Sequence, residues 1–534
     1  MKMGYIFEEL IRKFSENAEA DDHYTGRDII KLMVNILLAE GCDDIFDDGK
    51  VITILDQACG TGGMLSTGYN FIKRYNPSVD VRLFGQEINP ESYAMCLAEM
   101  LIKGQNAENI CYQDTMKADR FKGTKMRFVL ENPPFGTAWG GKDAAEGVED
   151  AVNAEYQKGF DGRWGAGLPG SGDMQMLFLQ SAIDKMDDNF GRAAIIENGS
   201  PLFSGGTASG ESQIRRWMLE SDLIEAIIAL PTDLFYNTGI ATYIWVLSKN
   251  KRPERKGKIQ LIDASTFFKK LRKALGDKKN EISPEDRSAV TKLYADFAEN
   301  EYCKIYRNEE FIYREYTVMQ PLQRSYAITE ERIQAMVGKG ALDSLYNEVK
   351  FADLELMEER DGKAQKQLNK FFVGKPIYDA ILADLNHAIS DTVWMSPDAF
   401  MPHLTEVLSK ATTDKKLLEK IADGLSIMDK NAEIQRDRKG NIIYDKETKD
   451  TELVKWEESI EDYMAREVLP HIPDAAAFFE ENLGAKKPVI KTGAEIPFTR
   501  YFYKYQPSTP SEELETRFKE LELSVTERVA KLFE

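Results

Sequence analysis

The sequence has little cysteine and little histidine. Among its 534 residues there are five cysteines and four histidines, and no two cysteines have the Cys-x-x-Cys spacing. These residues are too few and too scattered for a disulfide framework or a zinc cluster. We therefore expect no metal site.

Long apolar runs are also missing. No run approaches the roughly 20 residues of a membrane-spanning helix, and the N-terminus has no apolar core typical of a signal peptide. The sequence thus predicts a soluble cytoplasmic protein that does not enter a membrane. At about 150 residues per domain, its length predicts three or four structural units.

The chain has no excess of positive charge. It contains 69 Lys and Arg against 89 Asp and Glu, and its formal net charge is −20. This balance argues against a protein that coats nucleic acid over its whole surface. It is still compatible with a DNA enzyme, because phosphate contacts depend on the local field rather than on the total charge.

Strand and helix patterns alternate from about residue 26 to residue 265. Apolar residues at helical spacing fill 27–40, and 51–55 is a β-branched run typical of a buried parallel strand. Further strands are predicted at 81–84, 109–112, 126–130, 192–197, 226–230, 242–247 and 259–263, with helices at 64–75, 91–103 and 212–220. The alternation predicts a mostly parallel α/β sheet that binds its ligand at the carboxyl ends of the strands.

A glycine-rich turn, Asp56–Gly63, follows the first strand and opens a helix. Such a turn serves NAD, FAD, S-adenosylmethionine or close packing. Glu87 ends the second strand, where a carboxylate can accept ribose hydroxyls, and Asp114 follows the third, where one can accept an adenine amino group. Carboxylates at successive strand ends would repel a pyrophosphate. They favour a nucleoside with a sulfonium centre, and we expect S-adenosylmethionine.

The tetrapeptide Asn132-Pro133-Pro134-Phe135 follows the fourth strand. Its prolines fix the backbone and remove two N–H donors. The Asn132 amide oxygen and the Pro133 carbonyl can then both accept from one exocyclic amino group, which makes its nitrogen nucleophilic toward a methyl sulfonium. Phe135 offers a flat face for a base. This chemistry requires no metal and no base of unusual pKa.

Together these motifs resemble those of the modification (M) subunit of Type I restriction-modification systems, a DNA adenine-N6 methyltransferase. The likeness extends to 85–89, 169–175, 191–196, 230–231, 262–265, 468–471 and 496–502, and is weakest at about 335–450. It implies a Rossmann-like class I S-adenosylmethionine-dependent methyltransferase sheet, with a helical C-terminal region and a short helical N-terminus.

The resemblance also implies the site residues. The catalytic set is Asn132, Pro133, Pro134 and Phe135, and the cofactor contacts are Tyr24, Thr25, Arg27, Asp56, Ala58, Gly60, Thr61, Gly62, Gly63, Glu87 and Asp114. Segment 24–27 corresponds to the stretch that lies against the methionine end of the cofactor. The chain departs from the family in having Gly26 and Gln57 where proline is usual, and in having only 23 residues before Tyr24, where a helical domain is common.

We expect four segments along the chain. These are a short helical segment at 1–23, the methyltransferase domain at 24–265, a mostly helical connector at 266–455 and a helical partner-binding region at 456–534. The last helix has an apolar stripe formed by Leu514, Phe518, Leu521, Val525, Val529 and Leu532. The stripe fits a partner or coiled-coil helix and a helix packed on its own domain equally well.

An adenine N6 atom inside a duplex cannot reach such a site, so the base must flip out. Trp139 and Trp164, in the glycine-rich segment 136–172, are candidates for contact with a DNA strand, although core packing is the commoner role. The chain has no base-reading motif. We therefore expect it to act on double-stranded DNA with a specificity (S) subunit, and the resemblance adds a second modification subunit and, in some complexes, a restriction (R) subunit.

Three alternatives stay open at the sequence level. A protein glutamine methyltransferase uses the related motif Asn-Pro-Pro-Tyr. A self-sufficient DNA adenine methyltransferase would carry its own target recognition in 270–534. A degenerate, non-catalytic member of the family would serve only as a scaffold, although the intact Asn132–Phe135 motif argues against it.

Overall fold

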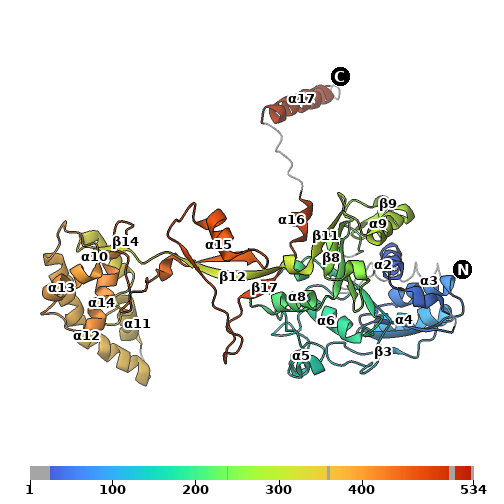
Figure 1. The fold of residues 1–534 in the computed structure, drawn as a ribbon, viewed down its shortest axis with the longest axis horizontal. Helices are drawn as coiled ribbons and strands as arrows, with labels where there is room; N and C mark the ends of the chain where they lie inside the picture. The colour runs from blue at the N-terminus through green and yellow to red at the C-terminus, as the bar shows by residue number, and fades with distance from the viewer. Residues whose placement is uncertain (1–24, 48, 237, 358–360, 504–510, 531–534) are drawn as a thin grey trace. The chain divides into compact units, whose positions relative to one another are not determined.

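The structure is a computed structural model that describes residues 25–47, 49–236, 238–357, 361–503 and 511–530 (Figure 1). The segment 1–23 and Tyr24 lie outside the described residues. The chain forms two compact units. The first contains the residues up to Arg314, Lys455–Glu457 and the residues from Glu481 onward, and the second contains Glu315–Val454 and Glu458–Glu480.

The first unit is built on a nine-stranded sheet with the order β11-β8-β6-β7-β5-β4-β1-β2-β3. Its strands are β1 (Val51–Asp56), β2 (Asp80–Glu87), β3 (Ile110–Tyr112), β4 (Phe128–Glu131), β5 (Arg192–Asn198), β6 (Ile224–Ala229), β7 (Thr242–Ser248), β8 (Lys258–Asp263) and β11 (Cys303–Arg307). All pairings are parallel except those of β7 with β5 and β6 and that of β11 with β8. The sheet confirms the expected α/β fold.

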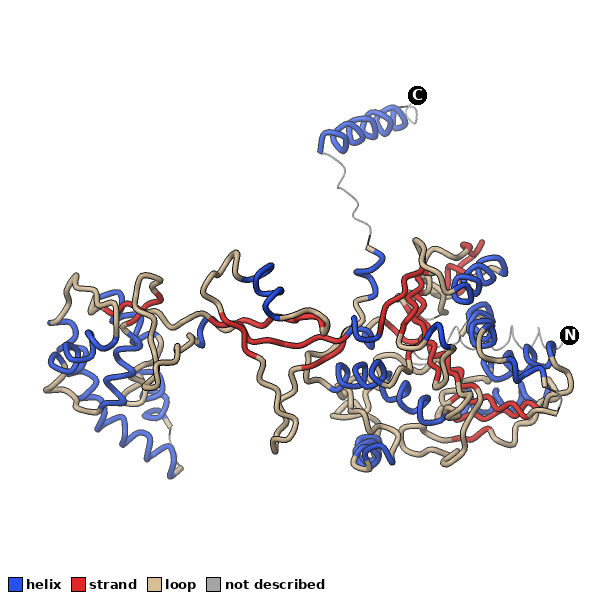
Figure 2. The backbone as a smooth tube through the Cα atoms, in the orientation of Figure 1, coloured by secondary structure: helices blue, strands red, loops and turns tan. Residues whose placement is uncertain are grey.

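Helices cover both faces of this sheet (Figure 2). Alternate strand residues point to opposite faces, so Ile196 joins the core under one group of helices and Ile195 joins the core under the other. The first group is α2 (Arg27–Ala39), α3 (Gly63–Tyr75), α4 (Pro90–Ile102) and α9 (Pro284–Asp296). The second group is α6 (Gln175–Lys185) and α8 (Gly210–Glu220).

The sheet continues past residue 265, where we expected the methyltransferase domain to end. After β8 the chain forms the antiparallel hairpin β9 (Lys269–Leu275) and β10 (Lys278–Glu281), then α9, and β11 pairs with β8. The end of the chain also returns to this unit, because Arg215 of α8 donates from Nε to the carbonyl of Ala494 at 2.8 Å. The connector and C-terminal segments thus contribute strands as well as helices.

The second unit is mainly helical, as expected for this stretch, but it contains short strands. Its core includes Met336, Ile381, Phe400 and Ile421. The helices are α10 (Glu330–Gly338), α11 (Glu348–Leu356), α12 (Gly362–His387), α13 (Pro397–Val407), α14 (Lys415–Gly424) and α15 (Ile460–Tyr463). The strands are β13 (Arg324–Tyr326), β14 (Ser426–Met428), β15 (Asp450–Lys455), β16 (Ala476–Phe478) and most of β12 (Ile312–Met319), whose first residues pair with β17 (Thr492–Ala494) of the first unit.

Two helices follow near the C-terminus, α16 (Phe498–Phe502) and α17 (Ser511–Ala530). The described members of the α17 stripe are Leu514, Phe518, Leu521 and Val525, and their exposed fractions lie between 53% and 72%. Within the described part of the chain, no helix is both long and apolar enough to cross a membrane.

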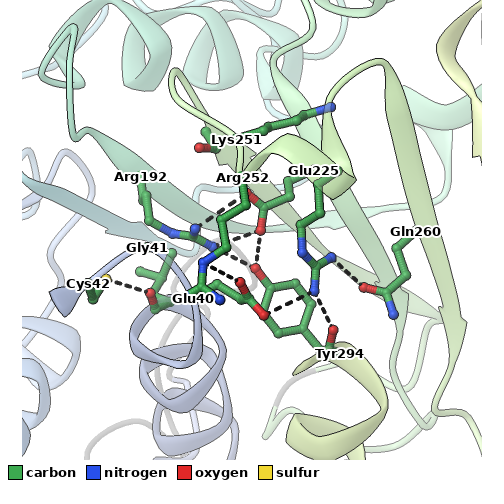
Figure 3. A network of polar contacts seen from close by, with 12 residues as sticks. Glu40, Gly41, Cys42, Arg192, Glu225, Lys251, Arg252, Gln260 and Tyr294 are labelled. Carbon is green, nitrogen blue, oxygen red and sulfur yellow. Dashed lines mark hydrogen bonds and ion pairs between the residues drawn. The ribbon is translucent and has the colours of Figure 1, made fainter. Parts of the chain in front are cut away.

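A buried polar network joins the strands β5 and β6 to the helices α2 and α9 (Figure 3). Arg192 of β5 donates from Nη2 to Glu225 of β6 at 2.9 Å and to the Tyr294 hydroxyl of α9 at 2.6 Å. Glu40, directly after α2, pairs with Arg252 at 3.0 Å and with Arg255 at 3.5 Å. Burial alone would raise the pKa of Glu225, but the Arg192 charge and the Tyr294 hydrogen bond hold that pKa below its ordinary value.

Glu225→Gln is expected to destabilise the first unit by about 3–5 kcal/mol, because Arg192 would become a buried cation without its counter-ion. Urea unfolding at pH 7 measures this loss. The matched control is Glu220→Gln on α8, where the carboxylate is 49% exposed and pairs with Arg216. That change is expected to cost about 0.5 kcal/mol or less. Equal losses in the two variants would contradict the role given to the network.

Candidate active site

The sheet order brings the sequence-predicted acceptors to one edge. Strands β4, β1 and β2 are adjacent and parallel, so their carboxyl ends lie side by side. Asp56 and Glu87 are the last residues of β1 and β2, and Asn132 directly follows β4. All three side chains are buried. The edge that we expected to bind a ligand therefore carries an amide flanked by carboxyl groups.

The glycine turn after β1 is held by these carboxyl groups. Asp56 accepts a hydrogen bond from the backbone N–H of Ala58 at 3.0 Å. Glu87 accepts from the N–H of Gly60 at 2.7 Å and from the N–H of Asn89 at 2.7 Å. The turn is thereby tied to the end of β2, next to the first residues of α3.

Gly62 is required by both conformation and space. Its φ is +80°, in the left-handed region, and a Cβ there would lie 2.7 Å from Cys96 Sγ and 2.7 Å from the Met100 methyl group, both on α4. Only glycine fits such a position. It brings α3, which begins at Gly63, close against α4 and places the free N–H groups of the helix at the ligand edge. Thr61, half-buried, precedes it in the same turn.

Asp114 lies just beyond β3, where its Oδ1 accepts from the N–H of Met116 at 2.8 Å. The adjoining Thr115 is fixed by two donors. Gln86 of β2 donates from Nε2 to the Thr115 hydroxyl at 3.1 Å, and Arg163 donates to the Thr115 carbonyl at 2.6 Å. The Asp114 loop is therefore held both by the end of β2 and by the long segment 136–172.

That long segment is folded, and its two tryptophans are part of the core. Trp164 is fully buried and Trp139 is 7% exposed, both in a cluster with Phe178 of α6. Trp164 donates from Nε1 to the Leu177 carbonyl at 3.0 Å, and Trp139 donates to the Gly170 carbonyl at 3.1 Å. Each therefore has the packing role that we gave as the commoner one, and its burial argues against contact with a DNA strand.

The predicted catalytic tetrapeptide is held from two sides. Asn132 donates from Nδ2 to the Thr25 hydroxyl at 2.8 Å. Pro133 is buried, and Pro134 and Phe135 are half-buried, with Phe135 packed against the core on the α2–α4 face. The rigid backbone that the sequence predicts is thus present at the end of β4.

Residues outside the predicted set also fix this loop. The Asp173 carboxylate accepts from the backbone N–H of Gly136 and from Gln175, whose Nε2 lies 2.6 Å away. Met174 donates its N–H to the Thr137 carbonyl at 3.0 Å. The segment 169–175 belongs to the resemblance, but the sequence gives no role for Asp173, because the long segment 136–172 separates it from the tetrapeptide.

The remaining predicted contacts lie at the start of α2. Thr25 is buried against Asn132, and Arg27 pairs with Glu99 of α4 at 3.8 Å. Tyr24 is outside the described residues. The structure therefore brings Thr25 to the predicted catalytic tetrapeptide and Glu87 to the glycine turn, while Asp114 bonds within its own loop.

Buried carboxyl groups dominate the electrostatics of the edge. Burial raises the pKa of Asp56 to about 8, with the Glu87 charge adding to the rise and the Ala58 N–H opposing it. Burial also raises the pKa of Glu131, at the end of β4, and of Glu197, near the end of β5, well above the ordinary value. A cationic ligand at this edge would favour the ionised form of these carboxyl groups, whereas a phosphate would oppose it. Together with the close glycine turn, the edge fits S-adenosylmethionine.

Residues 2–332 match the model of the N-6 DNA Methylase family. The chain is a member of this family. The match confirms the resemblance drawn from the motifs. The curated relatives that the chain is similar to include Type I methylase subunits. The HindI methylase subunit of Haemophilus influenzae is 28% identical over 49% of this chain and 54% of its own length. The MjaVIII methylase subunit of Methanocaldococcus jannaschii is 29% identical over 65% of this chain and 57% of its own.

Solved structures give similar matches. The Type I methyltransferase subunit from Streptococcus thermophilus is 26% identical, covers 58% of this chain and 60% of its own, and has a TM-score of 0.48. The EcoKI M protein is 21% identical over 51% of this chain and 53% of its own, with a TM-score of 0.38. The chain spans about half the length of the curated relatives it matches.

The raised pKa of Asp56 predicts that stability falls between about pH 4 and pH 8. In this range the folded chain keeps Asp56 protonated and the unfolded chain ionises it, so the native state binds more protons and the free energy of unfolding decreases as pH rises. Asp56→Asn is expected to lessen this decrease by up to about 1.4 kcal/mol per pH unit. Urea unfolding at pH 5, 6, 7 and 8 measures it.

The control for this experiment is Asp80→Asn, at the opposite end of β2, where the side chain is 55% exposed. Its unfolding curves are expected to follow those of the unmodified chain across the pH series. Parallel pH dependences in the Asp56→Asn variant and the unmodified chain would contradict the assignment.

Proposed function

We propose that this chain is the modification subunit of a Type I restriction-modification complex and transfers a methyl group from S-adenosylmethionine to adenine N6 in DNA. The observation that carries the proposal is the rigid Asn132–Pro133 pair of acceptors at the end of β4, beside a glycine turn lined by carboxyl groups. Membership of the N-6 DNA Methylase family and the names of the relatives support the same reaction.

The cofactor is assigned to the edge formed by β1, β2 and β3. The backbone of the turn would hold it through Ala58, Gly60, Thr61, Gly62 and Gly63, the carboxyl groups of Asp56, Glu87 and Asp114 would receive its polar groups, and the start of α2 would contribute Tyr24, Thr25 and Arg27. When bound, it supplies a methyl group on a sulfonium, which is open to in-line displacement by an amine.

The chain's own residues then prepare the amine. The Asn132 amide oxygen and the Pro133 carbonyl accept the two N6 protons in hydrogen bonds, which draws the nitrogen lone pair out of the ring. Phe135 provides a face for the flipped-out base, and stacking on it partly offsets the few kcal/mol of unstacking. The buried position of Asn132 keeps water away from its amide.

The proposed partners follow from what the chain carries. It is acidic overall, and its sequence has no helix-turn-helix, zinc-finger or RRM signature, so a specificity subunit would select the double-stranded DNA site. A second modification subunit and, where present, a restriction subunit would complete a cytoplasmic complex. We assign α17 to the specificity subunit because its apolar residues form a stripe at helical spacing, as in a helix that packs against a partner.

Asn132→Ala is expected to lower DNA methylation at least about 100-fold, because one of two preorganised acceptors is removed, while cofactor binding changes less than about twofold. The rate of DNA methylation is measured with labelled S-adenosylmethionine, by analysing digested nucleosides for N6-methyladenine. The assay is run with and without the specificity subunit. The control is Asn189→Ala in an exposed loop.

Three results would refute parts of this proposal. Full activity of the Asn132→Ala variant would remove the catalytic assignment. Label on a peptide glutamine instead of DNA would indicate a protein substrate. Site-specific methylation by the purified chain alone would indicate a self-sufficient enzyme.

Leu521→Asp is expected to weaken co-purification with the specificity subunit by about tenfold or more, because it places a charge within the apolar stripe. Leu523→Asp is a closely matched control, since Leu523 lies off the stripe with an exposed fraction of 66% against 67% for Leu521. Deletion of 511–534 is expected to abolish co-purification. Equal effects of the two leucine substitutions would argue against α17 as the contact.

A further inference from the structure

Thr25 and Asn132 meet although 107 residues separate them in the chain. The Asn132 Nδ2 donates to the Thr25 Oγ1 at 2.8 Å, and their exposed fractions are 8% and 9%. A side-chain amide donates only through nitrogen and accepts only through oxygen. In the structure the nitrogen end of the Asn132 amide faces the Thr25 hydroxyl, which can itself accept from an N–H or donate to a carbonyl oxygen.

The orientation of the Asn132 amide matters because its oxygen must accept a hydrogen bond from the substrate amine. The amide is planar, so holding its nitrogen on the Thr25 side places its oxygen on the opposite side. A rotation by 180° would present the amide N–H groups to an exocyclic amine, and two donors would then face each other. In the orientation that the structure shows, with Nδ2 toward the Thr25 hydroxyl, the Asn132 oxygen is free of that contact and can accept.

Thr25 is itself anchored through the start of α2. Asp28, in the first turn of α2, accepts from the Lys278 ammonium of β10 at 3.0 Å and from the N–H of Ile282 at 2.9 Å. Lys278 also donates to the Leu234 carbonyl at 2.9 Å, and its side chain is only 5% exposed. A buried ion pair from the β9–β10 hairpin thus fixes the helix end that Thr25 precedes.

Gly26, between Thr25 and α2, fits this arrangement. A Cβ at this position would lie 2.4 Å from Asp28 Oδ1 and 3.1 Å from Lys278 Nζ. A side chain at this position would therefore require the Asp28 carboxylate of the ion pair to shift.

We propose that Thr25 is a positioning residue that holds the Asn132 amide with its oxygen toward the substrate amine, and that the Asp28–Lys278 ion pair holds Thr25 in place. The inference deepens the proposed function and rests on it. It assigns to Thr25 an effect on the rate of methyl transfer, and to the β9–β10 hairpin a part in the same effect.

Thr25→Val keeps the shape of the side chain and removes its hydroxyl, whereas Thr25→Ser keeps the hydroxyl. In the assembled complex with the specificity subunit and duplex DNA, Thr25→Val is expected to lower kcat about 10- to 100-fold, as small misplacements of reacting groups do. The KM values for cofactor and DNA are expected to stay within about threefold. Thr25→Ser is expected to restore kcat to within about threefold of the unmodified chain.

Two outcomes would overturn this role. An unchanged kcat in Thr25→Val would mean that the hydroxyl does not orient the amide. A raised KM for the cofactor with unchanged kcat would make Thr25 a cofactor ligand only. If Thr25→Val does not fold, as judged by its melting temperature, Thr25→Ala and Thr25→Ser provide the same comparison.

Lys278→Met tests the anchor. It is expected to lower kcat less than Thr25→Val does, and the Thr25→Val, Lys278→Met double variant is expected to be no slower than Thr25→Val alone, because both act through one amide. Lys279→Met, next in sequence and 61% exposed, is the matched control and is expected to leave kcat unchanged. Multiplicative losses in the double variant would refute the anchoring role of Lys278.

The failure of this inference can be told from failure of the proposed function. If the unmodified chain methylates adenine and Thr25→Val does so equally fast, the function stands and the inference falls. If the unmodified complex transfers no methyl group to DNA, both fall.

Discussion

The site depends on the shared direction of β5, β4, β1 and β2. Because these strands are parallel neighbours, their last residues emerge at one edge, and segments distant in sequence supply Asn132, Asp56 and Glu87 to it. A reversed strand delivers its last residue to the other edge. Strand β7 is antiparallel to both of its neighbours and contributes none of the candidate site residues. The candidate site residues that adjoin strands therefore all follow strands that run in the same direction.

The same geometry brings buried carboxyl groups close together. Asp56, Glu131 and Glu197 are buried at the ends of neighbouring strands, and burial holds the pKa of each above its ordinary value. Groups with perturbed pKa values often mark functional sites because the protein accepts a less stable arrangement there. The raised pKa of Asp56 keeps this group protonated near neutral pH, and a cationic ligand would favour its ionised form. Any ligand that binds only the native state stabilises the fold.

The sequence predicted the central strands and the site motifs because their signals are local. Strand β1 is a β-branched run, and the glycine turn and the Asn132 tetrapeptide adjoin strand ends. The β9–β10 hairpin was missed because Lys269–Leu275 is mostly charged and exposed, without the alternation of a half-buried strand. The contact of Thr25 with Asn132 and the Arg192–Glu225–Tyr294 network were missed because tertiary packing alone brings those residues together.

Gly26 stands where the family usually has proline, and the structure shows a reason that the sequence does not. In sequence, glycine in place of the usual proline suggests a looser entry to α2, since proline fixes φ and glycine does not. In the structure, the backbone at Gly26 has a φ of −60° without proline, and the Asp28–Lys278 pair occupies the space that a ring would need. Rigidity at this point comes from a buried ion pair supplied by a distant hairpin. The ion pair thus takes the place of the constraint that a proline would impose beside Thr25. It also connects the predicted catalytic loop to a segment beyond the expected domain boundary.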